Sequence, residues 1–141
     1  MPDRGLDRFV QAQAPLYERA LAELHRGDKQ SHWMWFIFPQ VAGLGRSETA
    51  RFYALAGRSE ALAYLSHAVL GKRLLECVHA VLAHPDQRPE AIFGGVDAMK
   101  FRSSMTLFEA VADDPAPFAS ALEQFYAGRR DELTLAALGL A

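Results

Sequence analysis

The sequence has a single cysteine, Cys77, among its 141 residues. An internal disulfide and a cysteine-based metal cluster are therefore excluded within one chain, and a reducing compartment is expected. There is no uninterrupted apolar run of about 18 residues, which a membrane-spanning helix would need. The N-terminus, MPDRGLDRFV, lacks the apolar segment of a secretory signal. These absences predict a cytoplasmic protein that does not associate with membranes.

The chain also has little net charge, with a formal value of -2 at pH 7. It therefore has no global basic field that would attract a nucleic-acid polymer or an anionic membrane. Half of the residues are hydrophobic, which is too large a share for a disordered chain. At this length we expect one domain with one core over residues 1–141.

Signals of β-structure are scarce, because no Asn-Gly or Asp-Gly turn joins alternating apolar strands. Apolar residues recur instead at helical spacing, as in Leu70, Leu74, Val78 and Val81 of a block from about residue 68 to 84. The sequence therefore predicts an all-α fold, a compact multihelical domain of about six to seven helices.

Several residues predict where helices begin or end. Aspartate accepts hydrogen bonds from free N–H groups of a first turn, proline lacks a donor that the first turn does not need, and glycine adopts a left-handed terminal conformation. On this basis helices are predicted to start near Asp7, Pro15, Ser47, Ser59, Asp97, Asp114-Pro115 and Asp131, and to stop at Gly27, His84-Pro85 and Gly128.

The segment SHWMWFIFPQ, Ser31 to Gln40, concentrates aromatic residues. It fits either a strand that is apolar on both faces or a helical turn capped by Ser31 that ends before Pro39. Both interpretations bury most of it, since large aromatic side chains usually pack in a core. The polar residues His32 and Gln40 bound the segment and need solvent, a protein group or a ligand. His32 is a candidate acid or base.

A second polar group follows Asp97. On a helix, Lys100, Ser103 and Ser104 share one face and would suit an anion such as phosphate. In the alternative, the serines bond back to carbonyls one turn earlier and Lys100 is solvated. Arg46 lies in a glycine loop, GLGRS, ahead of a predicted helix, where backbone N–H groups can also meet phosphate. Without a preceding strand this loop matches no known nucleotide fingerprint.

Metal, cofactor and nucleophile signals are weak. The five histidines lack an HExxH arrangement, so a metal site would require His25, His32 and His79 to converge in space. Cys77 lies within a helical block, where a core position is expected rather than a reactive thiolate. We therefore predict no metal and no cofactor.

Taken together, several motifs resemble the bacterial DUF1810 family, a domain of unknown function. They span nearly the whole chain: LDRFVQAQ, YERALAEL, SHWMWFIFPQ, GLGRS, AYLSHAVLGKRLLEC, IFGGVDAMKFRSSMTLF and FYAGRRDELTL. The resemblance implies a compact all-helical fold and supplies no catalytic residues. Some relatives are labelled calpastatin-like, but calpastatin inhibitors are disordered, whereas this composition describes a folded core.

Two functional hypotheses follow from these residues, and only the first includes an enzymatic reaction. In the first, a pocket binds a small anionic or nucleotide-like ligand, with aromatic faces stacking a base and cations meeting phosphate. Its residues are His32, Trp33, Gln40, Arg46, Lys100, Ser103 and Ser104. A distant fold-level likeness to helical enzymes that remove ADP-ribose suggests hydrolysis with His32 as general base. In the second, an exposed aromatic patch binds a protein partner without catalysis.

Overall fold

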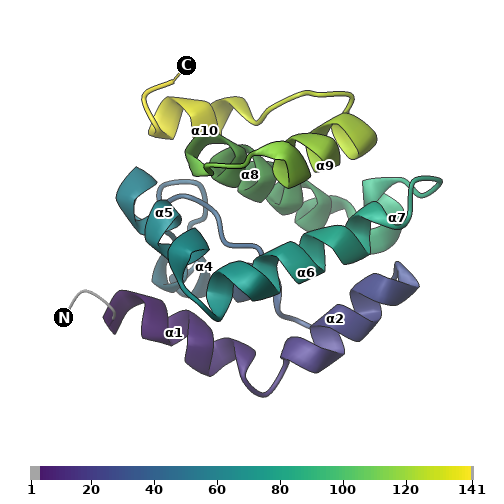
Figure 1. The fold of residues 1–141 in the computed structure, drawn as a ribbon, viewed down its shortest axis with the longest axis horizontal. Helices are drawn as coiled ribbons and strands as arrows, with labels where there is room; N and C mark the ends of the chain where they lie inside the picture. Colours follow the sequence, from purple (N-terminus) through teal and green to yellow (C-terminus); the bar gives the residue numbers. More distant parts are fainter. Residues whose placement is uncertain (1–3, 141) are drawn as a thin grey trace.

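The computed structural model describes residues 4–140, and every regular secondary-structure element within these residues is a helix (Figure 1). The helices are α1 (Arg4–Gln13), α2 (Tyr17–Arg26), α3 (Met34–Ile37), α4 (Glu48–Phe52), α5 (Arg58–Ser66), α6 (Leu70–Leu82), α7 (Pro89–Phe93), α8 (Gly95–Val111), α9 (Ala116–Tyr126) and α10 (Glu132–Ala137). The predicted all-α class is confirmed. The helices outnumber the expected six to seven because α3, α4, α7 and α10 are short.

Helix α6 crosses the middle of the molecule. In Figure 1, α1 and α2 lie along one side of it, whereas α8, α9 and α10 lie along the other. Helix α6 contacts α2, α5 and α9, and α8 contacts α5, α7, α9 and α10. Two long helices, α6 and α8, therefore organise the packing of the shorter ones.

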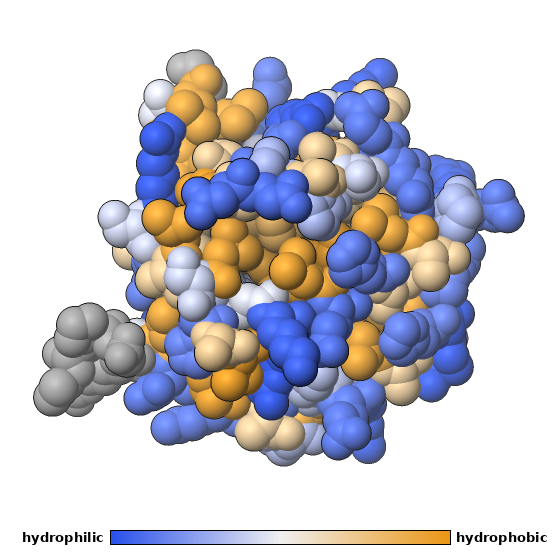
Figure 2. Space-filling view, in the orientation of Figure 1, coloured by the Kyte–Doolittle hydropathy of each residue, from blue (hydrophilic) through white to orange (hydrophobic). Residues whose placement is uncertain are grey.

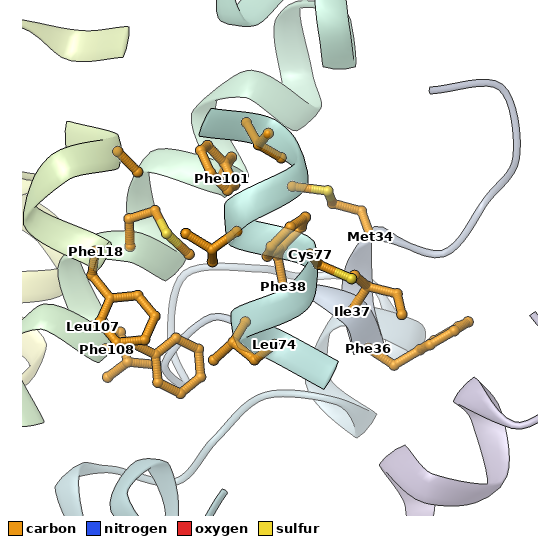
Figure 3. Close-up of a cluster of buried hydrophobic side chains, with 14 of the residues drawn as sticks. Met34, Phe36, Ile37, Phe38, Leu74, Cys77, Phe101, Leu107, Phe108 and Phe118 are labelled. Carbon is orange, nitrogen blue, oxygen red and sulfur yellow. The ribbon is translucent and has the colours of Figure 1, made fainter. Parts of the chain in front are cut away.

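The core is rich in aromatic side chains that the segment containing α3 and Phe38 brings together with those of α8 (Figure 3). Residues Leu74 and Cys77 of α6 lie between the α3 side chains and those of Phe108 and Phe118. The ring of Phe38 lies 4.9 Å from that of Phe101, at an interplanar angle of 78°. The segment Ser31 to Gln40 is thus chiefly a core element, and its short helix ends before Pro39 as the helical interpretation expected.

Several predicted helix ends are confirmed. Ser47 precedes α4, and its side chain accepts a hydrogen bond from the Ala50 N–H at 3.0 Å. The Asp131 carboxylate accepts one from the Thr134 N–H at 3.0 Å at the start of α10. Gly27 ends α2 with a φ of 69°, a conformation that glycine adopts without steric cost. Local side-chain chemistry therefore determines these boundaries.

Other predicted helix ends are wrong. Asp7 lies inside α1, which begins at Arg4. Pro15 lies in the turn between α1 and α2, two residues before α2 begins at Tyr17, rather than at the first position of that helix. Asp97 is the third residue of α8 rather than its cap, since Gly94, with a φ of 82°, lets the chain enter the helix earlier. Its carboxylate pairs with lysines instead.

Ser31 does not cap α3, because its side chain donates to Glu23 of α2.

The backbone next to Gln40 forms a single parallel bridge between Val41 and Leu55. The Leu55 N–H donates to the Gln40 carbonyl at 2.9 Å, and the Ala42 N–H donates to the Leu55 carbonyl at 2.8 Å. These hydrogen bonds fix the position of the backbone at Gln40.

The surface mixes apolar and charged side chains. Figure 2 shows one face on which apolar side chains gather near the centre, with polar ones around them. Leu62 of α5 and Leu75 of α6 are among the large apolar side chains that are partly exposed. None of the helices within residues 4–140 is both long enough and apolar enough to cross a membrane.

Candidate functional site

A pocket of about 240 Å³ lies beside the first turns of α8. Val96, Met99, Lys100 and Ser103 line it together, since residues spaced by three, four and seven positions share one helical face. The rest of the wall comes from the start of α10 and from the chain on both sides of the Val41 bridge. These parts contribute Gln40, Leu44, Gly45, Asp131 and Leu133, and Arg102 of α8 also lines the pocket. Three of the residues predicted from the sequence therefore meet there: Gln40, Lys100 and Ser103.

Lys100 supplies an ammonium group to this pocket. Its Nζ atom lies 3.7 Å from a carboxylate oxygen of Asp97, one turn earlier on α8. The same atom lies 5.3 Å from the centre of the Trp35 ring, within the range of a cation–π contact. Asp97 is closer to a second lysine, since Lys29 Nζ lies 2.9 Å from its other oxygen. The Asp97 carboxylate therefore pairs with both lysines, and its contact with Lys29 is the shorter one.

Three other polar residues of the pocket already form hydrogen bonds to groups of the protein itself. The Ser103 hydroxyl donates to the Met99 carbonyl at 3.2 Å, as the alternative interpretation of this strip expected, and its oxygen can still accept. The Arg102 guanidinium donates to the carbonyls of Arg129 and Arg130, at 2.7 and 2.8 Å. Neither carbonyl carries a negative charge, so these bonds do not neutralise the guanidinium. The Asp131 carboxylate is bonded to Thr134.

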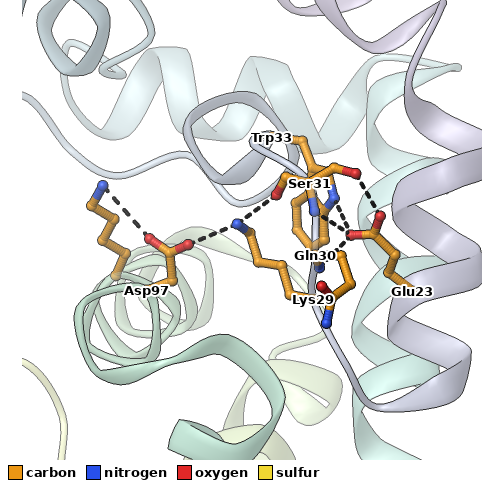
Figure 4. A network of polar contacts seen from close by, with 7 residues as sticks. Glu23, Lys29, Gln30, Ser31, Trp33 and Asp97 are labelled. Carbon is orange, nitrogen blue, oxygen red and sulfur yellow. Dashed lines mark hydrogen bonds and ion pairs between the residues drawn. The ribbon is translucent and has the colours of Figure 1, made fainter.

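Trp33 does not face a ligand, because it is fully buried. Its indole Nε1 donates to the Glu23 carboxylate at 2.9 Å, and the same carboxylate accepts from the N–H groups of Gln30 and Ser31 (Figure 4). Lys29 Nζ lies 4.9 Å from the Trp33 ring centre. The predicted stacking of a base on Trp33 is therefore wrong.

Glu23 is the buried centre of this network. Burial alone would raise the pKa of its carboxyl group, but the hydrogen bonds from Ser31, Gln30 and Trp33 outweigh burial and lower the pKa to about 2. The ionised carboxylate therefore fixes the chain between α2 and α3. Sequence reasoning missed Glu23 because its partners lie seven to ten positions ahead, beyond the spacing of one helix.

His32 lies at a different, smaller cavity. This cavity measures about 70 Å³, and His32 lines it with Lys29, Trp33, Met34, Trp35 and Asp97. The His32 side chain is exposed. Arg46 is also exposed, and it does not line the larger pocket, although its neighbour Gly45 does. The residues expected around one site are thus divided among two cavities, the surface and the core.

Ser104 belongs to the core. It is fully buried, and its hydroxyl is the one side-chain polar atom within residues 4–140 that is buried without a hydrogen-bond partner. One residue beyond Ser103, a helix turns by about 100°. The prediction that Ser104 shares the ligand-facing strip is therefore wrong, because this rotation directs it into the protein.

Replacing Ser104 by alanine should keep the free energy of unfolding unchanged or raise it by up to about 1 kcal/mol, since it removes an unsatisfied buried hydroxyl. Thr106→Val is the matched control. The Thr106 hydroxyl donates to the Arg102 carbonyl at 2.8 Å and accepts from the Asp131 N–H at 2.9 Å. We expect this control to lose about 1 to 3 kcal/mol. Urea unfolding measures both, and a larger loss for Ser104→Ala would contradict the assignment.

Metal and thiol chemistry find no support in the geometry. Among residues 4–140, no three histidine, cysteine, aspartate or glutamate side chains come together as a metal site would require. The convergence of His25, His32 and His79 that a metal site would need is therefore not found among these residues. Cys77 is buried as expected, and burial raises the pKa of its thiol to about 12. A thiol in this state is not a nucleophile near neutral pH.

Comparisons with known proteins agree with the fold. A conserved hypothetical protein of Mycobacterium tuberculosis, Rv1873, has a solved structure that is similar to this one with a TM-score of 0.94. The two sequences are 45% identical, and the match covers 96% of this chain and 97% of that one. No curated protein matches the chain. The family model described as "Protein of unknown function (DUF1810)" matches residues 3–138, so the chain belongs to the DUF1810 family.

Proposed function

We propose that the protein binds a small ligand that joins an anionic group to a short apolar portion, in the pocket beside Lys100. The observation that carries this proposal is the meeting of Lys100 with Gln40 and Ser103 around a pocket whose wall is otherwise largely aliphatic. Ligand sites typically combine an apolar wall with a few convergent polar groups. The ammonium group would meet the anion, and the side chains around it would contact the apolar portion.

The charges near the pocket favour an anion. A ligand that draws Lys100 away from Asp97 leaves that carboxylate paired, because Lys29 lies only 2.9 Å from it. The positive charge of Arg102 adds to the attraction, since its bonds to two carbonyls do not neutralise it. The Asp131 carboxylate is held by Thr134 at the start of α10.

The size of the pocket favours a ligand smaller than a nucleotide. Its volume of about 240 Å³ lies below the range of about 300 to 1,000 Å³ that is typical of ligand pockets. A nucleotide or ADP-ribose would place only one of its groups inside. His32 lines the other cavity, so the geometry supports binding rather than hydrolysis with His32 as the base.

Chemical-shift titration of the ¹⁵N-labelled protein tests the proposal. The probes are 3-methylbutanoate, inorganic phosphate, AMP and ADP-ribose. We expect 3-methylbutanoate, which combines a carboxylate with a branched apolar group, to shift the amide signals of residues 40–45 and 96–103. Lys100→Met should weaken this binding at least about tenfold, because a charge-assisted hydrogen bond contributes about 1.5 to 3 kcal/mol.

The control is Lys72→Met, which removes an exposed lysine of α6 away from the pocket and should leave the affinity unchanged. The proposal fails if 3-methylbutanoate does not shift these signals, or if Lys100→Met binds 3-methylbutanoate as well as the unaltered protein does.

A further inference from the structure

The three most exposed large apolar side chains within residues 4–140 all line the pocket beside Lys100. Val96 is 69% exposed, Met99 is 72% exposed and Leu133 is 68% exposed. The next in order, Phe52 of α4, is 58% exposed. Exposed apolar side chains are common singly, but their concentration around one pocket marks an interaction site.

A small ligand does not account for these side chains. A group that fills about 240 Å³ occupies the recess and leaves side chains that are two-thirds exposed still facing water. Val96 and Met99 come from α8, and Leu133 comes from α10, so the apolar rim extends over two helices. Methionine adapts its shape to a partner surface. An extended occupant would cover both the recess and its rim.

The charges identify the chemistry of this occupant. Lys100 and Arg102 bring two positive charges to the pocket. Lys100 lies 3.7 Å from the Asp97 carboxylate, which Lys29 approaches more closely at 2.9 Å, and Arg102 is bonded to two neutral carbonyls. The one carboxylate in the lining, that of Asp131, caps α10. A carboxylate directed at Lys100, next to an aliphatic side chain in the recess, would complement this arrangement.

We propose that the natural occupant is a segment of a partner protein that inserts a bulky aliphatic side chain into the recess and places an adjacent acidic side chain against Lys100. This inference rests on the proposed function, because it assigns the ligand of the same pocket to a polypeptide. The flanking residues of that segment cover Val96, Met99 and Leu133. The partner is therefore an acidic and aliphatic peptide segment.

An anionic lipid surface fits less well. The apolar side chains surround a recess, which receives a single protruding group rather than a flat layer. A lipid surface would also bring its phosphates close to Asp131 and to the exposed Glu132 beside it. A single carboxylate on a peptide can instead be directed at the Lys100 ammonium.

Three end-blocked peptides test the inference by ¹⁵N chemical-shift titration: Gly-Glu-Leu-Glu-Gly, Gly-Lys-Leu-Lys-Gly and Gly-Glu-Ser-Glu-Gly. We expect the first to shift the amide signals of residues 96–103 and 131–133, and the other two to bind at least about tenfold more weakly. Met99→Ser and Leu133→Ser should each weaken binding of the first peptide severalfold, and should weaken it more than they weaken binding of 3-methylbutanoate, because the peptide covers the exposed parts of these side chains as well as the recess. Leu62→Ser, at a separate pocket between α5 and the end of α8, is the control and should change neither.

The outcomes separate the two proposals. If 3-methylbutanoate binds and the acidic leucine peptide does not, the inference is overturned and the small-ligand proposal stands. If all three peptides bind equally, or if the protein sediments with phosphatidylglycerol vesicles while no peptide binds, the peptide assignment is overturned. If neither 3-methylbutanoate nor the peptide binds, both proposals fail. Because Met99 and Leu133 are exposed, their serine variants should melt within a few degrees of the unaltered protein.

Discussion

Phe101→Ala is expected to lower the free energy of unfolding by about 3 to 5 kcal/mol, the usual cost of removing a buried phenylalanine ring. The Phe101 ring is fully buried and joins several aromatic side chains. Its centre lies 4.9 Å from that of Phe38 and 4.8 Å from that of Phe93. Phe125 and Tyr126 of α9 lie 6.4 Å away. The variant leaves a cavity where α8 meets the aromatic segment, α7 and α9.

Urea unfolding followed by circular dichroism measures this loss. Met99→Ala is the matched control, because Met99 lies two residues earlier on the same helix and is exposed. We expect it to change stability by no more than about 0.5 kcal/mol. Phe101→Leu should lose less than Phe101→Ala, since leucine refills part of the cavity. Equal losses for Met99→Ala and Phe101→Ala would show that this cluster does not hold the helices together.

Glu23→Gln is expected to lower the free energy of unfolding by about 3 kcal/mol at pH 7. The folded protein lowers the pKa of Glu23 from its ordinary value of 4.5 to about 2, and each unit corresponds to about 1.4 kcal/mol. Glutamine keeps the shape of the side chain but cannot be ionised. The loss is therefore the part of the stability that depends on the charge.

The pH dependence gives the sign of this effect. Because the pKa is lower in the folded state, the stabilisation is complete above about pH 4.5 and is lost as the pH falls towards 2. Unfolding measured from pH 7 to pH 2 should therefore show the stabilities of the unaltered protein and Glu23→Gln converging at the acid end. Glu18→Gln, at an exposed position of the same helix, is the control and should run parallel to the unaltered protein. A gap between the unaltered protein and Glu23→Gln that stays constant with pH would contradict the role of the charge.

Features that depend on neighbouring residues were predictable from the sequence. Ser47 and Asp131 cap helices because their side chains bond to N–H groups three residues ahead. Asp97 has the same chemistry, but Lys29, far away in the sequence, lies within 2.9 Å of it. Nothing in the residues next to Asp97 indicates this partner, and the N-cap position of α8 is occupied by Gly94, which has no side chain to bond to the first turn.

The aromatic segment shows the limit of periodicity. Its residues are apolar on successive positions, so a strand and a helical turn fit equally well. The choice depends on Phe38 meeting Phe101 and on Trp33 bonding to Glu23, and both are tertiary contacts. The expectation that most of this segment is buried was confirmed, since large aromatic side chains usually pack in a core.

The candidate site was predictable in part. Helical spacing brought Lys100 and Ser103 to one face, and their pocket does include Gln40. The same spacing places Val96 and Met99 on this face. They were not predicted, because the site was inferred from polar side chains alone. The assignment of Trp33 and Ser104 to the site failed because burial depends on what packs against each side chain. Their exposure cannot be obtained from their spacing along the chain.

The lone bridge between Val41 and Leu55 has a consequence for engineering the protein. It anchors one end of the loop that follows, and the Ser47 cap anchors the other. Gly43, between these anchors, has a φ of 102° and open space where a side chain would begin. Extra residues inserted after Gly43 would extend into solvent without pulling on Gln40, since lengthening a surface loop costs little. A fluorescent or paramagnetic tag grafted there would stand next to the pocket and report on its occupancy.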